Sequence, residues 1–251
     1  MLSKLENQLI NFISDRKNCN PSEIGEIYLS IKQKFNINGK KYKILCSNFY
    51  ELHRMIYRNN NETDIIDSIV FFEFLYLLRF ISYSFSKRKI SYYKEIAKKI
   101  SNHIDKPLTI IDYGCGLGYL SRVTYSLKSN SKIFFIDIDS LFFDFLKYIS
   151  KEDGINFESI EIDKNLIYPN LPNHNVCIAM EVIEHTIDPV KIIKNIAKSI
   201  DNGGVLYGNF KDHNKDYFHV SYNLKEIRLV LLKYFNIVEK NMYKRNGVLC
   251  I

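Results

Sequence analysis

The chain has 251 residues, of which 46% are hydrophobic and 25% are charged. This composition provides a core for one α/β domain with a smaller addition, and it excludes a disordered tail, a collagen and a coiled coil. The formal net charge is +7, but the lysines and arginines are spread along the chain without a block of five or six like charges. A solvated basic surface is therefore favoured over a nucleic-acid-binding stripe, and nucleic acid is not an expected partner.

The five cysteines are scattered and never form a CxxC pair. This pattern argues against a disulfide framework and a thiolate zinc site, and it favours the reducing cytoplasm. The amino-terminal segment carries acidic residues and has no long apolar core, so we expect no signal peptide. The most apolar stretch, residues 65–85, contains several charges and indicates a buried helix, not a membrane span. The sequence leaves the oligomeric state open.

The first part of the chain, residues 1–105, has a helical pattern. Apolar residues recur every three or four positions from Leu2 to Ile13 and again from Ile24 to Ile31. Asn38-Gly39 lies between alternating residues, which fits either a two-residue hairpin or a loop between helices. Aromatic residues between Phe71 and Tyr83 either line a substrate lid or belong to the core. Further helices are expected over 49–58, 64–85 and 91–103.

From residue 106 to residue 251 the pattern changes to βαβ units. Apolar runs at 108–113, 132–137, 155–162, 175–180, 204–210, 235–243 and 247–251 predict seven strands. Helices are expected over 117–127, 141–149, 189–200 and 224–234. The turn at 245–247 is too short for a parallel crossover, so the last two strands must be antiparallel. We therefore predict an α/β, Rossmann-like seven-stranded mixed sheet with helices on both faces and an antiparallel last hairpin.

A glycine-rich turn follows the first predicted strand and leads into a helix. Gly114, Gly116 and Gly118 carry no Cβ that would block a tight turn or a ligand lying against the backbone. A dinucleotide-binding fingerprint would place its third glycine at position 119, which is Tyr119, so NAD and FAD are disfavoured. Asp137 ends the next strand about 20 residues after the turn, where an acid is expected to meet ribose hydroxyls.

The DxGxGxG segment from Asp112 to Gly118 resembles motif I of the class I S-adenosylmethionine-dependent methyltransferases, and the resemblance covers residues 90 to 251. It implies that S-adenosyl-L-methionine is the cofactor. It also implies that the glycine turn packs beneath the methionine and ribose and that Asp112 helps to hold the amino group. In one respect the chain departs from the family, because Asn175 begins the fourth strand where an aspartate is usual. The cofactor-binding residues that the resemblance implies are Asp112, Gly114, Cys115, Gly116, Asp137, Ile138, Asp163 and Met180.

The segment EVIEH at 181–185 follows the fourth strand. On a helical turn, Glu181, Glu184 and His185 would share one face. They fit a general base beside the methyl group, a set of hard-metal ligands, or a structural cap. The segment resembles two branches of the superfamily, which are the ubiquinone-biosynthesis type of small-molecule methyltransferase and the metal-dependent small-RNA 2′-O-methyltransferases. In the second branch a later histidine completes the metal site, and His213 and His219 are candidates for it.

The interpretation that follows is a methyltransferase that transfers a methyl group to an oxygen or nitrogen nucleophile of a small molecule. His185 and Glu181 are its predicted catalytic residues, and no required metal is expected. Two alternatives are a metal-dependent RNA 2′-O-methyltransferase and a non-catalytic module that binds S-adenosylmethionine. The sequence does not identify the methyl acceptor.

Overall fold

The computed structural model describes residues 4–18, 20–35, 77, 87–162, 168–212 and 223–248. The chain forms two compact units, Met1–Ser86 and Lys87–Ile251. In the first unit, α1 (Lys4–Lys17) and α2 (Pro21–Phe35) pack together through buried side chains that include Leu9, Ile13 and Ile24. These two helices were predicted. The Asn38-Gly39 turn, the predicted helix 49–58 and all of 64–85 except Leu77 lie outside the described residues.

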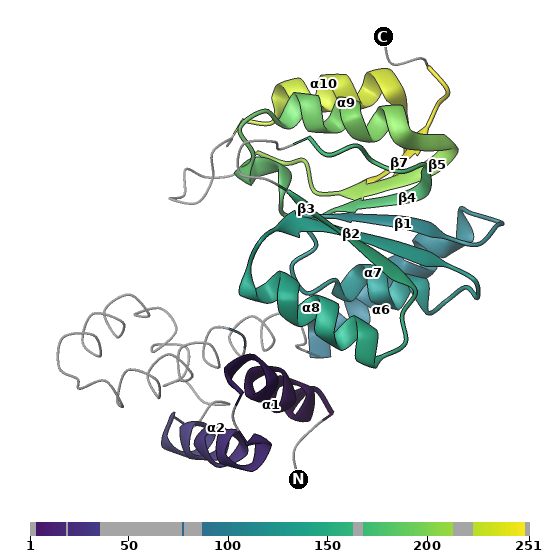
Figure 1. Ribbon diagram of the computed structural model, residues 1–251. Coiled ribbons are helices and arrows are strands. Elements are labelled where there is room, and N and C mark those ends of the chain that lie inside the picture. Colours follow the sequence, from purple (N-terminus) through teal and green to yellow (C-terminus); the bar gives the residue numbers. More distant parts are fainter. Residues whose placement is uncertain are drawn as a thin grey trace. The chain divides into compact units, whose positions relative to one another are not determined.

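The second unit is built on a seven-stranded sheet (Figure 1). The strand order is β3-β2-β1-β4-β5-β7-β6, with β1 to β5 parallel and β7 antiparallel to both of its neighbours. This confirms the predicted mixed, Rossmann-like sheet. The strands are β1 (Thr109–Tyr113), β2 (Lys132–Ile138), β3 (Phe157–Ile162), β4 (His174–Ala179), β5 (Ile200–Gly208), β6 (Phe235–Glu239) and β7 (Met242–Arg245).

Helices cover both faces of this sheet. Figure 1 shows α6 (Lys87–Asn102), α7 (Tyr119–Tyr125) and α8 (Leu141–Glu152) on one face, and α9 (Pro189–Ser199) and α10 (Lys225–Tyr234) on the other. Two helix starts follow directly from their sequence. The Ser140 side chain accepts a hydrogen bond from Phe143 N at the start of α8, and the Asp188 side chain caps α9 just before Pro189. Because α6 packs against α7, the second unit includes α6 in addition to the predicted range 106–251.

The last hairpin is antiparallel as predicted, but its position differs from the prediction. The run 235–243, predicted as a single strand, covers all of β6 and the first half of β7, and Lys240 and Asn241 form the turn between these two strands. Asn241 has φ 63°, a left-handed conformation that asparagine tolerates and that closes two-residue hairpins. The predicted turn at 245–247 therefore follows β7, and residues 246–248 are not part of a strand.

Successive side chains of the central strands point to opposite faces of the sheet, so the core has one half on each face. Ile111 and Tyr113 of β1 belong to a buried cluster that continues through Ala179 of β4 to the apolar stripe of α9. Asp112 points to the opposite face of β1, because successive side chains of a strand alternate. This geometry brings a carboxylate between the sheet and α7.

Candidate active site

The candidate site lies at the edge of the sheet where the parallel strands end. Strand order reverses between β1 and β4, since β1 is followed in the chain by β2 on one side while β4 lies on the other. In open α/β sheets, ligands bind outside the carboxyl ends of the strands at such a reversal. Three segments lie at this edge: the glycine loop after β1, Asp137 near the end of β2, and the turn after β4.

The glycine loop adopts a backbone that other residues rarely adopt. Gly114 and Gly118 have φ of 65° and 57°. A Cβ at Gly114 would lie 2.1 Å from Val182 Cγ2, and one at Gly118 would lie 2.8 Å from the ring of Phe135. The loop is tied to β2, because Gly114 N donates to Ile136 O at 2.7 Å. The predicted glycine turn is therefore a close-packed junction of the loop, β2 and the turn after β4.

Asp137 lies directly against this loop. Its Oδ2 accepts hydrogen bonds from Gly116 N at 2.8 Å and from Cys115 Sγ at 3.7 Å, and its Oδ1 accepts one from Ile138 N at 2.8 Å. Burial raises the pKa of Asp137, and these donors oppose the rise. Beside it, the Ile138 side chain is 49% exposed. A carboxylate and an apolar surface thus stand together at the edge, as a ribose and a base require.

Asp112 is more deeply enclosed, with an exposed fraction of 5%. Its Oδ2 accepts a 2.5 Å hydrogen bond from Ser121 Oγ of α7. Burial raises the pKa of Asp112 to about 7, and the nearby Asp137 adds to the rise while Ser121 opposes it. The family resemblance implies that this enclosed carboxyl helps to hold the amino group of the cofactor, and in that family such a contact usually runs through water.

Of the other predicted cofactor-binding residues, the structure describes Cys115 and Met180 but not Asp163. The Cys115 thiol is buried, and burial raises its pKa well above the ordinary value. Met180 follows β4 at the same edge and is partly buried. Asp163 lies outside the described residues. Sequence reasoning did not identify Ser121, Val182 or Asn209 as parts of this site. Val182 and Asn209 act through partners that are distant in the sequence, and Ser121 meets Asp112 only once α7 packs on β1.

The turn after β4 is not the helical turn that was predicted. Glu181 has φ 53°, and the short 3₁₀ helix η1 begins only at Ile183 and ends at His185. Glu184 is completely buried, whereas Glu181 and His185 are exposed. The three side chains therefore do not share one face, because a left-handed residue and a 3₁₀ turn replace the 3.6-residue period. The Glu181 carboxylate instead accepts a 2.7 Å hydrogen bond from Asn209 Nδ2.

A metal centre is not assembled by the part of the chain that the structure describes. Within it, no three histidine, cysteine, aspartate or glutamate side chains come close enough together to hold an ion. His213 and His219, the residues considered for closing such a site, lie outside the described ranges. The expectation that no metal is required stays a prediction.

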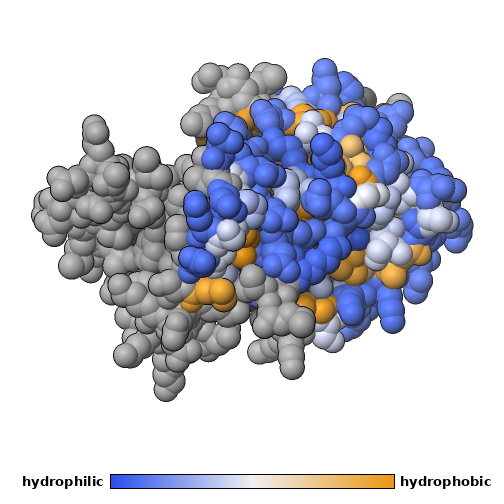
Figure 2. Space-filling view, turned by 60° about the horizontal axis from the view of Figure 1, so that its bottom comes forward, coloured by the Kyte–Doolittle hydropathy of each residue, from blue (hydrophilic) through white to orange (hydrophobic). Residues whose placement is uncertain are grey.

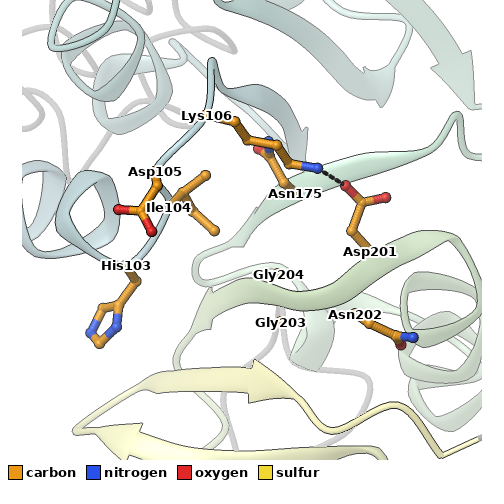
Figure 3. Close-up of a pocket in the computed structure, with 9 residues that line it drawn as sticks. All are labelled: His103, Ile104, Asp105, Lys106, Asn175, Asp201, Asn202, Gly203 and Gly204. Atoms are coloured by element: carbon orange, nitrogen blue, oxygen red, sulfur yellow. Dashed lines mark hydrogen bonds and ion pairs between the residues drawn. The ribbon is translucent and has the colours of Figure 1, made fainter.

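A separate hollow of about 360 Å³ opens at the opposite end of the strands (Figure 3). Asn175 of β4, Asp201 of β5 and Lys106, which precedes β1, are among the residues that line it. Lys106 and Asp201 form a 2.7 Å ion pair, and the oxygen and the nitrogen of the Asn175 amide are both bonded to the backbone. These three side chains thus hold β1, β4 and β5 together, and we assign the hollow no chemistry.

The described surface fits the solvated surface that the composition predicts. Figure 2 shows a described face that is mostly hydrophilic, with apolar residues in small separate groups. Among the described helices, none combines the length and the apolar character that crossing a bilayer requires.

Comparisons with known proteins give sequence relatives and a fold. No family model matches the chain. It is 25% identical over 134 residues to a ubiquinone biosynthesis O-methyltransferase of Coxiella burnetii, covering 53% of this chain and 54% of that protein. It is 30% identical over 111 residues to the enzyme of the same name from Hydrogenovibrio crunogenus, covering 43% and 44%. The chain thus spans about half the length of the curated relatives that it matches.

Among solved structures, TehB from Haemophilus influenzae has a TM-score of 0.52 with 17% sequence identity, and the match covers 66% of each chain. At this identity the likeness concerns the fold alone. It confirms the predicted architecture of the second unit.

Proposed function

We propose that this chain, a class I methyltransferase by its fold and its sequence relatives, transfers the methyl group of S-adenosylmethionine to an oxygen or nitrogen of a small molecule. The observation that carries the proposal is the contact of Asp137 with the glycine loop at the reversal point of the sheet. The curated relatives are named ubiquinone biosynthesis O-methyltransferases, and this name supports a small-molecule acceptor over RNA and an enzyme over a non-catalytic module.

The residues at the edge fit the cofactor. The missing side chain at Gly116, which has φ 53°, leaves room for the methionine and ribose to lie on the backbone, whereas the missing side chain at Gly114 makes room for Val182. Asp137 accepts two hydrogen bonds from the ribose diol, because a carboxylate has several acceptor positions. Asp112 holds the amino group, Met180 lies along the methionine, and the acid at Asp163 reaches the adenine. When bound, the cofactor supplies a methyl group that is already activated as a sulfonium.

The chain's own contribution to the chemistry is alignment and proton transfer. Glu181 and His185 are exposed at the same edge, where either side chain can take the proton of a hydroxyl acceptor. A negatively charged oxygen is a better nucleophile than the hydroxyl, so removing the proton favours transfer. We therefore keep Glu181 and His185 as the proposed catalytic residues.

The first 105 residues are proposed to supply the other wall of the acceptor pocket. Deleting residues 1–60 should leave binding of S-adenosylhomocysteine intact and remove turnover. Full-rate turnover by the truncated protein would contradict this role. The scattered cysteines support a cytoplasmic location.

The function is tested by titrating the purified protein with S-adenosylhomocysteine in a calorimeter. A panel of phenols, catechols and amines is then incubated with S-adenosylmethionine, and methylated products are detected by mass spectrometry. We expect binding and at least one methylated compound, and we expect that chelator leaves the rate nearly unchanged. Absence of binding refutes the function, and loss of activity in chelator that magnesium or manganese restores would instead indicate a metal-dependent enzyme.

A further inference from the structure

The turn after β4 is held in an unusual backbone conformation. Glu181 is one of four non-glycine residues with positive φ among those described. Such conformations persist only when the surroundings hold them, and they cluster at functional sites. On one side, Val182 packs against Gly114 so closely that no Cβ fits there. On the other side, the Glu181 carboxylate is held by Asn209.

Asn209 reaches Glu181 because of the strand register. Ala179 at the end of β4 pairs with Gly208 at the end of β5. The residues that follow these two positions therefore leave neighbouring strands at the same edge. Asn209 Nδ2 donates to Glu181 Oε1 at 2.7 Å across this edge. The hydrogen bond joins two turns that are 28 residues apart in the chain.

The other end of the Asn209 amide is left over. A carboxylate accepts hydrogen bonds, so the nitrogen must face Glu181 and the oxygen must point away from it. Asn209 Oδ1 is inaccessible to solvent and has no hydrogen-bond partner. A buried acceptor without a partner is unfavourable, so the hydrogen bond to Glu181 must outweigh this cost for Asn209 to keep its orientation.

We propose that Asn209 is a positioning residue, which fixes the direction of the Glu181 carboxylate through its amide nitrogen. The proposal rests on the proposed function, because it assumes that Glu181 faces the acceptor. Through this contact, Asn209 sets the direction in which the carboxylate of the base points toward the acceptor.

The first test compares Asn209→Ala with the wild type, using as probe the panel compound that is methylated fastest. We expect kcat/KM to fall by about tenfold to a hundredfold, as the loss of a charge-assisted hydrogen bond implies. The loss should lie in kcat, while the acceptor KM and the affinity for S-adenosylhomocysteine stay within about twofold. In a Glu181→Gln background, Asn209→Ala should have a much smaller effect on kcat, because the carboxylate that it positions is absent.

A second test exchanges the amide and the carboxylate between the two positions. It measures the melting temperature, so it needs no methyl acceptor. Asn209→Asp alone places two carboxylates in contact and should lower the melting temperature. Adding Glu181→Gln restores a donor and an acceptor, so the double variant should regain the melting temperature of the wild type. The double variant should not regain transfer, because the carboxylate is then on the wrong residue.

The matched control is Asn175→Ala, which removes a buried asparagine from β4 at the opposite end of the sheet. It should lower the melting temperature without lowering kcat. Three results would overturn the proposal: an unchanged kcat/KM in Asn209→Ala, an equal loss of kcat in the Glu181→Gln background, or no recovery of melting temperature in the exchanged pair. If the wild type binds no S-adenosylhomocysteine, the proposed function fails instead, and the exchanged pair still tests the contact.

Discussion

Replacing Asp112 with asparagine should change how the stability of the protein depends on pH. Asparagine has nearly the same shape and keeps an oxygen that accepts the hydrogen bond from Ser121 Oγ. It cannot ionise. The substitution therefore removes the titration of a buried carboxyl while it preserves the packing between β1 and α7.

The magnitude follows from the rise of the Asp112 pKa from 3.8 to about 7. Below pH 3.8 the carboxyl is protonated in both the folded and the unfolded chain. As the pH rises to 7, the unfolded chain loses this proton first, so the wild type becomes less stable; above about pH 7 the effect is complete. A rise of about three units at 1.36 kcal/mol each gives an upper limit of about 4 kcal/mol, of which about 3 kcal/mol falls above pH 4.5.

The assay is urea unfolding of the wild type and of Asp112→Asn at pH 4.5 and pH 8. The free energy of unfolding of the variant should gain about 2 to 3 kcal/mol relative to the wild type between these pH values. Other titrating groups change both proteins alike and cancel in the difference. A difference between the two proteins that does not vary with pH would refute the reasoning, since the carboxyl would then be ionised at both pH values.

Three further predictions concern the site and the sheet. Asp137→Ala should weaken S-adenosylhomocysteine binding by about 1.5 to 3 kcal/mol in calorimetry, whereas Asp139→Ala should have little effect; equal losses would contradict the ribose assignment. Gly114→Ala should abolish that binding and lower stability by about 2 to 4 kcal/mol. Adding Val182→Ala should recover only a small part of the stability, because it removes the 2.1 Å contact with Cγ2 but leaves the 2.6 Å contact with the Cβ of residue 182 and the strain of φ 65°. Burial lowers the pKa of His174 from 6.5 to about 4. The free energy of unfolding of the wild type should therefore fall by up to about 3 kcal/mol as the pH falls from 6.5 to 4, whereas that of His174→Gln should not. The same pH dependence in the two proteins would argue against a buried neutral histidine.

The sequence by itself determined the architecture of the second unit and the location of the glycine loop. Five of the seven strands, and the four helices between and after them, fall where apolar periodicity and turn residues placed them, because these signals are local to each element. The glycine loop and Asp137 were readable for a similar reason. Their spacing reflects the length of one βα unit, which varies little.

Only the tertiary structure decided which side chains meet at the edge. The 235–243 run is periodic enough for one strand, and the left-handed Asn241 divides it in two only because β7 pairs with β5. Glu181 and Glu184 were assigned to one face on the assumption of a helix, but the packing of Val182 against Gly114 imposes a different turn. The hydrogen bond from Asn209 to Glu181 depends on the register of β4 and β5, which no short stretch of sequence specifies, since register is fixed by the pairing of whole strands.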